Sequence, residues 1–497
     1  MSDHIPGFDR DQVVLFPNTL DRYIDEENPV RFIDAFVNSL DLKELGFKKV
    51  EPSEMGRPSY DPYDMLKLYV YGYLNQVRSS RKLERECQRN VEVMWLMKKL
   101  APDFKTIADF RKDSIDCIKP VFKEFVFLCK SLDLFGGELI GIDGSKFRAV
   151  NSKEKNFTRE KLIDRLKWIN EKIENYLKEM DENDENEKEG SSSASNEGHI
   201  KDLTEKTKKL AERKSEYEGL MARMEATGVE ESSLTDPDSR LMVTGKGKLD
   251  VCYNVQTAVD SKNKLVPDYD VTNDPLDGKM LSHMAKGAKE TLGVEKIDVT
   301  ADTGYHDAGE IKECVDNGIT PYVSESETKG RWRSIKLGVP EPEFYDTMFV
   351  HDRAIDVCIC PAGQRLKLWS SYVRHEERYS VYRTEACFSC PLMVRCTKNK
   401  HGRVIIRWEH QEIIDEMRKR MKREPSKFEA RKELCEHPFG TMKRAFNQGY
   451  FLMKGLRKVK GEMGFTMLAY NMRRAINMLG TKALLASLNT QRMKNRR

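Results

Sequence analysis

Hydrophobic residues in the first 135 positions recur at intervals of three and four, which is the spacing of amphipathic helices. One such segment follows Pro62, and Met65, Tyr69 and Tyr73 would share its buried side. Proline in a first turn and serine caps indicate where other helices begin. Residues 1–135 are therefore predicted to form an all-α domain, which fits a DNA-binding bundle and equally any other helical bundle.

The pattern changes at Glu138–Ile142, an apolar run that predicts the first strand and is followed directly by Asp143. A buried strand that ends on an acid holds the carboxylate at the rim of a core. Taken alone, Asp143 is more readily explained as a turn residue after a strand. A chemical role requires partners further along the chain.

Two long segments with heptad spacing follow, from Leu162 to Met180 and from Ile200 to Met224. Between them, residues 181–198 are rich in Asp, Glu, Asn and Ser, and they are predicted to form a mobile loop. We predict an antiparallel helical hairpin inserted at residues 157–228. The hairpin could pair two copies of the chain or pack on itself, and self-packing is the simpler interpretation.

Strand patterns resume at residue 249 and alternate with helical ones as far as residue 323. A hairpin of strands followed by alternating helix and strand predicts a mixed sheet flanked by helices, which is an α/β fold. The strand before Asp302 ends on that acid. The expected elements are strands at 249–259 and 265–271, a helix at 276–292, a strand at 296–301, a helix at 307–317 and a strand at 319–323.

Residues 325–425 break this alternation and contain five of the eleven cysteines. Two of them have the C-x-x-C spacing of a zinc knuckle, and further cysteines lie on both sides. Zinc here would be structural, because the insertion has little core of its own. Buried free thiols are the alternative. The four thiolates that most simply close a tetrahedral site are Cys360, Cys387, Cys390 and Cys396.

Composition narrows the class of protein. A chain of 497 residues is too long for one ordinary domain. No apolar run is long enough to predict a membrane span, and the N-terminus does not have the pattern of a secretory signal. An odd number of cysteines, eleven, then argues for reduced thiols or metal ligands.

Charge is unevenly distributed along the chain, although the net charge is only +4. From Lys454 to Arg497 there are eleven Lys and Arg residues and one acid, Glu462. A second basic segment lies at residues 417–423. This distribution predicts a polyanionic partner, nucleic acid first, with a solubilising tail as the alternative.

Asp143 and Asp302 would lie at the same edge of the predicted sheet if their strands are neighbours. Two close carboxylates repel each other unless a cation lies between them, and Mg²⁺ prefers carboxylate oxygens. A third acid from a later helix would complete a two-metal site of the kind that promotes in-line attack on a phosphodiester. Glu436 is the best candidate for that acid, and Glu433 is the competing choice.

Lys443 lies seven residues after Glu436, so two helical turns would place both on one face. The lysine could then hold a phosphate near the metal site. Pro438 lies between them, and it predicts a kink or the start of a helix at that position.

Several of these segments, in this order, resemble the DDE transposases of bacterial insertion sequences. The resemblance extends from about residue 10 to residue 480. No single motif decides it, but their order is specific. The segments are Tyr60–Lys67, Thr106–Lys112, Ile142–Lys146, Thr235–Arg240, Tyr253–Gln256, Ala301–Tyr305, Glu436–Arg444 and Leu468–Ala475.

The resemblance implies an RNase H-like catalytic domain in which Asp143, Asp302 and Glu436 bind two Mg²⁺ or Mn²⁺ ions. It implies cleavage at transposon ends and transfer of the freed 3′-hydroxyls into target DNA by a homodimer, in the bacterial cytoplasm at the nucleoid. Lys443 matches the family's lysine. The arginine and tyrosine that some relatives carry before the glutamate are not matched, since Lys432 and Glu429 occupy those positions.

These observations divide the chain into four parts: residues 1–135, helical; 136–324, the first part of the catalytic domain; 325–425, the cysteine-containing insertion; and 426–497, the helical remainder with its basic tail. A metal-dependent transposase is the first hypothesis. A DNA-binding protein that kept the fold without catalysis is the second, and a nuclease of the same fold without strand transfer is the third.

Overall fold

The computed structural model describes residues 19–51, 59–151, 153–188, 194–325, 341–374 and 376–495. A six-stranded sheet lies at its centre, with the strand order β4-β5-β1-β7-β8 and β6 paired to β5. Strand β1 is antiparallel to β5 and parallel to β7, and β7 is parallel to β8. The strands are β1 (Leu139–Arg148), β4 (Arg240–Val243), β5 (Leu249–Asp260), β6 (Asp268–Thr272), β7 (Ile297–Ala301) and β8 (Ile319–Val323).

This sheet confirms the predicted mixed α/β fold, and it is consistent with the RNase H-like sheet that the resemblance implies. Helices α9 and α14 both contact β1, β5 and β7, and α10 contacts β8. The helices around the sheet are α9 (Leu281–Leu292), α10 (Ala308–Asp316), α13 (Gln411–Arg423), α14 (Pro425–Gly440), α15 (Leu456–Leu479) and α16 (Thr481–Asn495).

Strand β1 corrects one expectation, because it continues five residues past Asp143 to Arg148. Its pairing with antiparallel β5 extends from Ile140 to Arg148, whereas its parallel pairing with β7 covers only Leu139 to Gly141. Asp143 therefore lies where the parallel partner ends, and not at the end of its own strand. Asp302 does follow the last residue of β7, as predicted.

The N-terminal region is helical, as predicted. Asn28 and Asp61 cap α1 and α2 by accepting hydrogen bonds from the amides of Val30 and Tyr63, and each helix has proline in its first turn. The helices are α1 (Pro29–Val37), α2 (Pro62–Leu74), α3 (Ser80–Arg89), α4 (Val91–Leu96), α5 (Phe104–Asp113) and α6 (Ile118–Ser131).

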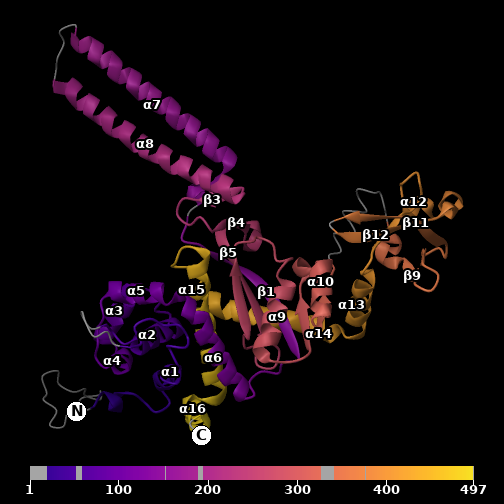
Figure 1. Ribbon diagram of the computed structural model, residues 1–497, viewed down its shortest axis with the longest axis horizontal. Coiled ribbons are helices and arrows are strands. Elements are labelled where there is room, and N and C mark those ends of the chain that lie inside the picture. The colour runs from indigo at the N-terminus through magenta and orange to yellow at the C-terminus, as the bar shows by residue number, and fades with distance from the viewer. Residues whose placement is uncertain are drawn as a thin grey trace, which may run out of the picture.

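Helix α15 joins the N-terminal helices to the sheet by contacting α2, α6 and β6 (Figure 1). Most of its length is buried. Its buried Glu462 accepts hydrogen bonds from the amides of Leu452 and Met453 and lies 3.5 Å from Nη1 of Arg78. One hydrophobic core consequently extends from the N-terminal helices across the sheet.

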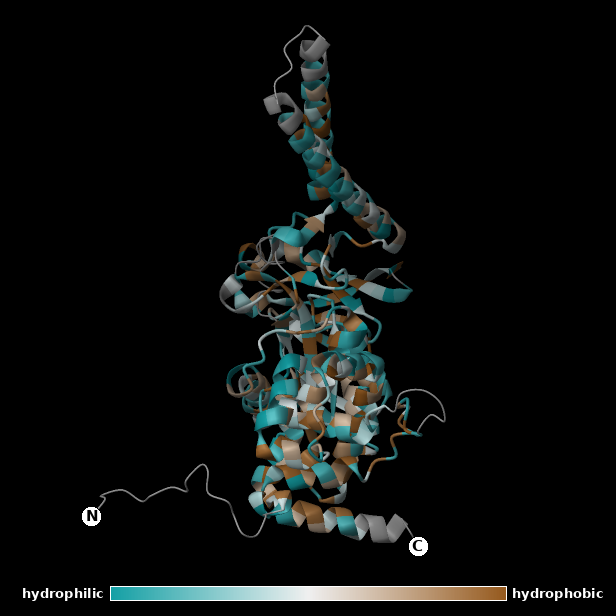
Figure 2. Cartoon of the chain, turned by 90° about the vertical axis from the view of Figure 1, so that its left-hand side faces the viewer, coloured by the Kyte–Doolittle hydropathy of each residue, from teal (hydrophilic) through white to brown (hydrophobic). Residues whose placement is uncertain are grey.

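Two long helices, α7 (Arg159–Lys188) and α8 (Ala194–Thr227), pack against each other and extend away from the body (Figure 1). Figure 2 shows hydrophilic residues over much of this hairpin. The short strands β2 (Asn156–Thr158) and β3 (Glu231–Ser233) pair at its base. Residues 181–188 and 194–198 are helical where a loop was predicted, because Glu, Lys and Ala favour a helix; residues 189–193 lie outside the described residues.

The cysteine-containing insertion forms a second sheet in the order β13-β12-β11-β10-β9. A small core of Phe349, Cys358, Leu366, Tyr382 and Ile405 supports it. Helix α13 follows this sheet and leads back to β8 and α10 (Figure 1). The elements are β9 (Val350–Asp352), β10 (Val357–Ile359), β11 (Arg365–Arg374), β12 (Glu377–Arg383), α12 (Met393–Cys396) and β13 (Ile405–Trp408).

Helix α14 contains Pro438, where the sequence predicted a kink or a helix start. No helix starts there: α14 continues to Gly440 and is followed by a π-helical segment, Thr441–Ala445. Within the described residues no helix is long and apolar enough to cross a membrane. The division of the chain into these four sequence-derived domains stays a prediction.

Candidate active site

Strand register places Asp143 beside Asp302. Gly141 of β1 pairs with Thr300 of β7. Asp143 lies two residues further along β1, and Asp302 lies two residues after Thr300, directly past the end of β7. Because neighbouring strands lie about 4.8 Å apart and side chains alternate between faces, both acids point to the face that carries Gly141. The two predicted acids are thus brought together. Each also accepts a hydrogen bond of 2.8 Å from a nearby glycine amide, Gly144 for Asp143 and Gly304 for Asp302.

The Asp143 carboxyl is electrostatically strained. Burial is the largest cause, followed by the charge of Asp302, and together they raise the pKa of Asp143 to about 6; the Gly144 hydrogen bond and Arg431 oppose this shift. A bound cation would stabilise a carboxylate that is both partly desolvated and repelled by a second carboxylate. The donor chemistry at Asp143 and Asp302 therefore fits a hard divalent ion.

Asp143→Asn is expected to raise the free energy of unfolding at neutral pH by up to about 3 kcal/mol. The folded-state pKa of Asp143, about 6, exceeds its ordinary value of 3.8, so ionised Asp143 destabilises the fold. That cost is absent below pH 3.8 and complete above pH 6. Thermal unfolding of both proteins as a function of pH checks this. An equal difference at acidic and neutral pH would contradict it.

Helix α14 lies directly over β1 at Gly141. A Cβ atom at Gly141 would lie 3.0 Å from Sγ of Cys435 and 3.1 Å from Cβ of Leu434, so glycine permits this close approach. Glu436 is the next residue of the helix after Cys435, and it is exposed. The competing acid Glu433 forms an ion pair with Lys264, four residues after the end of β5.

Glu436 is not gathered with the aspartates in this structure. Among the described residues, no three or more His, Cys, Asp or Glu side chains are grouped so that they could hold a metal ion. The described contacts include no hydrogen bond or ion pair of the Glu436 carboxylate. Glu436 lies on α14 one residue after Cys435, which contacts Gly141 of β1, and its side chain is exposed to solvent.

Lys443 lies over the C-terminal half of β1. Its Nζ donates to Oγ of Ser145 at 2.7 Å and to the carbonyl of Lys146 at 3.0 Å, and it lies 4.7 Å from the Phe147 ring centroid. Burial lowers the pKa of Lys443, while the Cys252 thiol and the Asp143 carboxyl oppose that shift. The ammonium group therefore lies within electrostatic reach of Asp143.

Asp277 is a third acid near the pair that sequence reasoning missed. Its Oδ1 accepts hydrogen bonds from Asn254 at 2.6 Å, from Gln256 at 2.7 Å and from Lys146 at 3.2 Å. Its charge contributes to the raised pKa of Asp143. The Tyr253–Gln256 motif was the available signal, because it contains two of these donors, Asn254 and Gln256. Nothing in the sequence around Asp277 itself indicates a site.

Gln256 links this network to the loop that carries Asp302. Its side-chain carbonyl accepts a hydrogen bond from the hydroxyl of Tyr305, three residues after Asp302, while its amide donates to Asp277. Both Gln256 and Tyr305 are fully buried. The hydrogen bond between Tyr305 and Gln256 therefore fixes the loop after β7 to the opposite face of the sheet.

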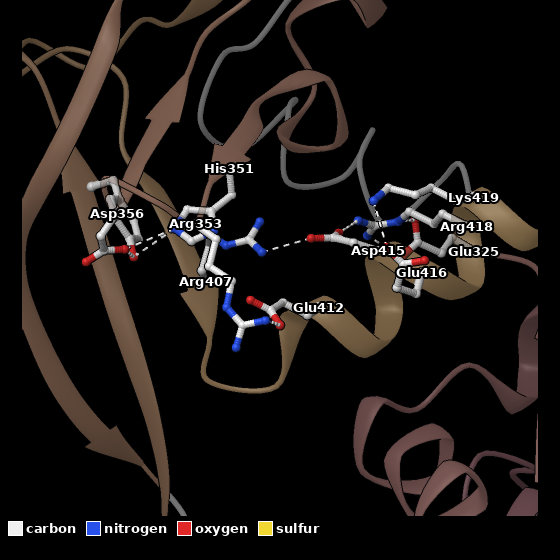
Figure 3. Close-up of polar contacts among 11 residues, drawn as sticks. Glu325, His351, Arg353, Asp356, Arg407, Glu412, Asp415, Glu416, Arg418 and Lys419 are labelled. Atoms are coloured by element: carbon white, nitrogen blue, oxygen red, sulfur yellow. Dashed lines mark hydrogen bonds and ion pairs between the residues drawn. The ribbon is translucent and has the colours of Figure 1, made fainter. Parts of the chain in front are cut away.

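The same loop approaches the insertion through Glu325, whose ion pair with Arg418 is drawn in Figure 3. His306 lies 3.3 Å from Glu325, which pairs with Arg418 of α13 at 2.5 Å. Arg418 and Arg407 of β13 both pair with Asp415, at 2.6 and 2.8 Å. Burial raises the pKa of Glu325, but the hydrogen bonds from His306 and Arg418 outweigh it and hold that pKa well below its usual range.

The four predicted zinc ligands line one cavity of about 30 Å³, together with Phe344, Phe349 and Leu366. Burial raises the pKa of the Cys396 thiol to about 11, and the other three thiols add to that shift. Backbone amides of Gln364 and Arg403 lie 3.3 and 3.5 Å from the sulfurs of Cys360 and Cys387. All eleven cysteines are free thiols. The set of donors fits zinc, although no group at metal-holding geometry is present among the described residues.

Comparison with known proteins identifies two segments. Residues 18–113 match the model of a transposase domain (DUF772), and residues 359–476 match the model of a transposase DDE domain. No curated protein matches the chain. The two matches confirm the resemblance to DDE transposases, and neither bears on an origin in a bacterial insertion sequence.

One solved structure is similar over most of the chain. It is the cryo-EM structure of a piggyBac transposase synaptic complex with hairpin DNA, at 10% identity and a TM-score of 0.31, with 97% of this chain and 83% of that chain covered. At that score the similarity supports no further argument.

Proposed function

We propose that this chain, with its two matches to transposase domains, is a DDE-type DNA transposase that cleaves phosphodiesters at transposon ends and joins the freed 3′-hydroxyls to target DNA. The observation that carries the proposal is the pair Asp143 and Asp302 on adjacent strands, with the pKa of Asp143 raised to about 6. Such a pair needs a cation, and a hard divalent ion is the natural one.

Asp143, Asp302 and Glu436 would hold two Mg²⁺ or Mn²⁺ ions. When bound, these ions supply charge stabilisation for the attacking and leaving oxygens of an in-line displacement. Lys443, whose Nζ donates to Ser145 Oγ at 2.7 Å, would exchange that contact for a phosphate oxygen of the substrate. The Gln256 and Tyr305 hydrogen bond holds the Asp302 loop in place while DNA binds.

The partner in this proposal is DNA, bound by a homodimer that brings two transposon ends together. Basic residues near the C-terminus would neutralise phosphates, so affinity should fall with salt. Lys454 and Lys458 are the better candidates there, because Arg457 is already paired with Asp116. A bacterial insertion sequence as the source, and with it the cytoplasm and nucleoid as the setting, belong to the same proposal.

The domain assignments are also part of the proposal. Residues 1–135 would contribute to DNA binding, and residues 136–324 and 426–497 would together form the catalytic domain. The insertion at 325–425 would be held by one structural zinc ion at Cys360, Cys387, Cys390 and Cys396.

Cys390→Ser is expected to lower the zinc content of the purified protein from about one ion per chain to near none. The remaining three thiolates leave one corner of the closed, four-ligand structural site empty, which weakens zinc binding. Metal analysis by mass spectrometry is the measurement. Cys358→Ser is the matched control, because Cys358 is buried on β10 and does not line the cavity. Zinc-free wild-type protein, or zinc retained by Cys390→Ser, would contradict the site.

The proposed function is tested with a donor plasmid that carries transposon ends, a target plasmid and Mg²⁺. New covalent joints between donor ends and target support a transposase. Cleaved ends without joints would leave a nuclease of the same fold. DNA binding with neither product would show a protein that kept the fold without catalysis.

A further inference from the structure

Strand β11 extends beyond the sheet that carries it. Residues Arg365 to Lys367 pair with β10 on one side, and Lys367 to Arg374 pair with β12 on the other. From Leu368 onward the strand has β12 as its partner and one open edge. Leu366 is the one residue of β11 that is buried. Strand β11 is thus open to solvent over most of its length, whereas β12 is mostly half-buried and pairs with β13 on its other side.

The strand register places Tyr372, Tyr379 and Arg383 on one face of the ribbon formed by β11 and β12, and Trp369, at the irregularity between Leu368 and Ser370, lies against Arg383. We name these four residues the aromatic face. Tyr372 pairs with Tyr379 in register, and their rings stack at 5.4 Å and 14°. The Arg383 guanidinium lies 5.3 Å from the Trp369 ring centroid. Trp369 is 66% exposed and Tyr372 is 41% exposed. Large apolar side chains that remain exposed together mark a binding surface.

The ribbon is also basic. From residue 365 to residue 383 it carries five Lys and Arg side chains, against the two acids Glu376 and Glu377. Among the described residues, none of those five makes an ion pair. Their charge is therefore available to a polyanion. The basic residues are Arg365, Lys367, Arg374, Arg378 and Arg383.

We propose that the aromatic face binds a DNA strand with unpaired bases. This inference rests on the proposed function, which makes DNA the partner. Phosphates alone would need only the basic side chains, whereas exposed rings gain most by stacking on a base whose own face is free. In a duplex those faces are covered by neighbouring base pairs. The combination of stacked rings with unpaired basic groups therefore favours single-stranded over duplex DNA.

The test uses the full chain, EDTA to exclude divalent ions, and a fluorescein-labelled oligothymidylate compared with a duplex of the same length. Trp369→Ala is expected to weaken binding to the single strand about tenfold, and Tyr372→Ala to a similar degree. Duplex binding should change about twofold or less, because it depends on phosphate contacts. Phe388→Ala is the matched control, since Phe388 is 63% exposed in the same insertion and lies outside the ribbon.

Trp369→Phe provides a second measurement that does not depend on losing a ring. The Trp369→Phe variant should keep most of the affinity for the single strand. The chain has five tryptophans, and the part of the fluorescence quenching by bound DNA that Trp369 contributes should be lost. Unchanged single-strand affinity in Trp369→Ala, an equal loss for the duplex, or a change in oligomeric state in place of DNA affinity would overturn the inference. Because binding is measured without cleavage, a chain that binds single strands through this face but joins no DNA would refute the proposed function alone.

Discussion

Asp143→Asn is expected to lower the rates of DNA cleavage and strand transfer by at least about a thousandfold. The substitution keeps the size of the side chain but removes one of the two charges that would hold the divalent ion beside Asp302. A cation that stabilises the transition state by several kcal/mol accounts for this loss, because each factor of ten in rate corresponds to about 1.4 kcal/mol. The rates are measured with saturating Mg²⁺ on a labelled transposon end.

Asp298→Asn is the matched control for that measurement. Asp298 lies on β7, on the same face as Asp302, and it accepts a hydrogen bond of 2.6 Å from Lys427. Removing this ion pair should change the rate by about threefold at most. The mechanism would be refuted if Asp143→Asn cleaved DNA as fast as the wild type. A similar loss in both variants would instead indicate a general effect on the sheet.

The inactive Asp143→Asn variant should also be the more stable protein at neutral pH, as argued above from its raised pKa. This combination separates a chemical role from a structural one. A carboxylate kept for stability would leave a weaker fold when it is removed. A variant that is both slower and more stable would show that the Asp143 carboxylate serves chemistry at a cost to the fold.

Sequence patterns predicted the parts of the fold that depend on local signals. The strand before Asp302 and the strand Ile319–Val323 follow from short apolar runs bounded by polar residues. The length of β1 could not be predicted, because it is set by nine paired positions on β5, more than a hundred residues later in the chain. Tertiary pairing overrode the local turn signal at Asp143.

The candidate site likewise has parts that local sequence signals predict and parts that only the folded structure shows. Asp143 and Asp302 each belong to a motif, and Asp143 lies in β1 while Asp302 directly follows β7, so the register of these two strands brings them together. Asp277 carries no local signal, and its role depends on donors from β1 and β5 that become neighbours only after folding. The Cys387 and Cys390 spacing could be recognised, but the enclosing cavity also requires Phe344 and Phe349 from before the sheet.

Glu436→Gln is expected to lower strand transfer about a thousandfold and to raise the Mg²⁺ concentration needed for half-maximal rate. Glu436 follows Cys435, which lies against Gly141 of β1, and its carboxylate is not engaged by any described residue. A side chain in this position can turn toward the aspartates when a cation draws it in. Strand transfer measured over a series of Mg²⁺ concentrations gives both quantities.

Glu433→Gln and Asp277→Asn decide whether Glu436 is the third acid. Glu433 is paired with Lys264, so its replacement should change the rate by about threefold at most. Asp277 accepts three hydrogen bonds at Oδ1, which tie it to Lys146, Asn254 and Gln256. Asp277→Asn should therefore slow the reaction without changing the Mg²⁺ requirement. If Asp277→Asn raised the Mg²⁺ concentration needed for half-maximal rate and Glu436→Gln did not, Asp277 would be the third metal-binding acid in place of Glu436.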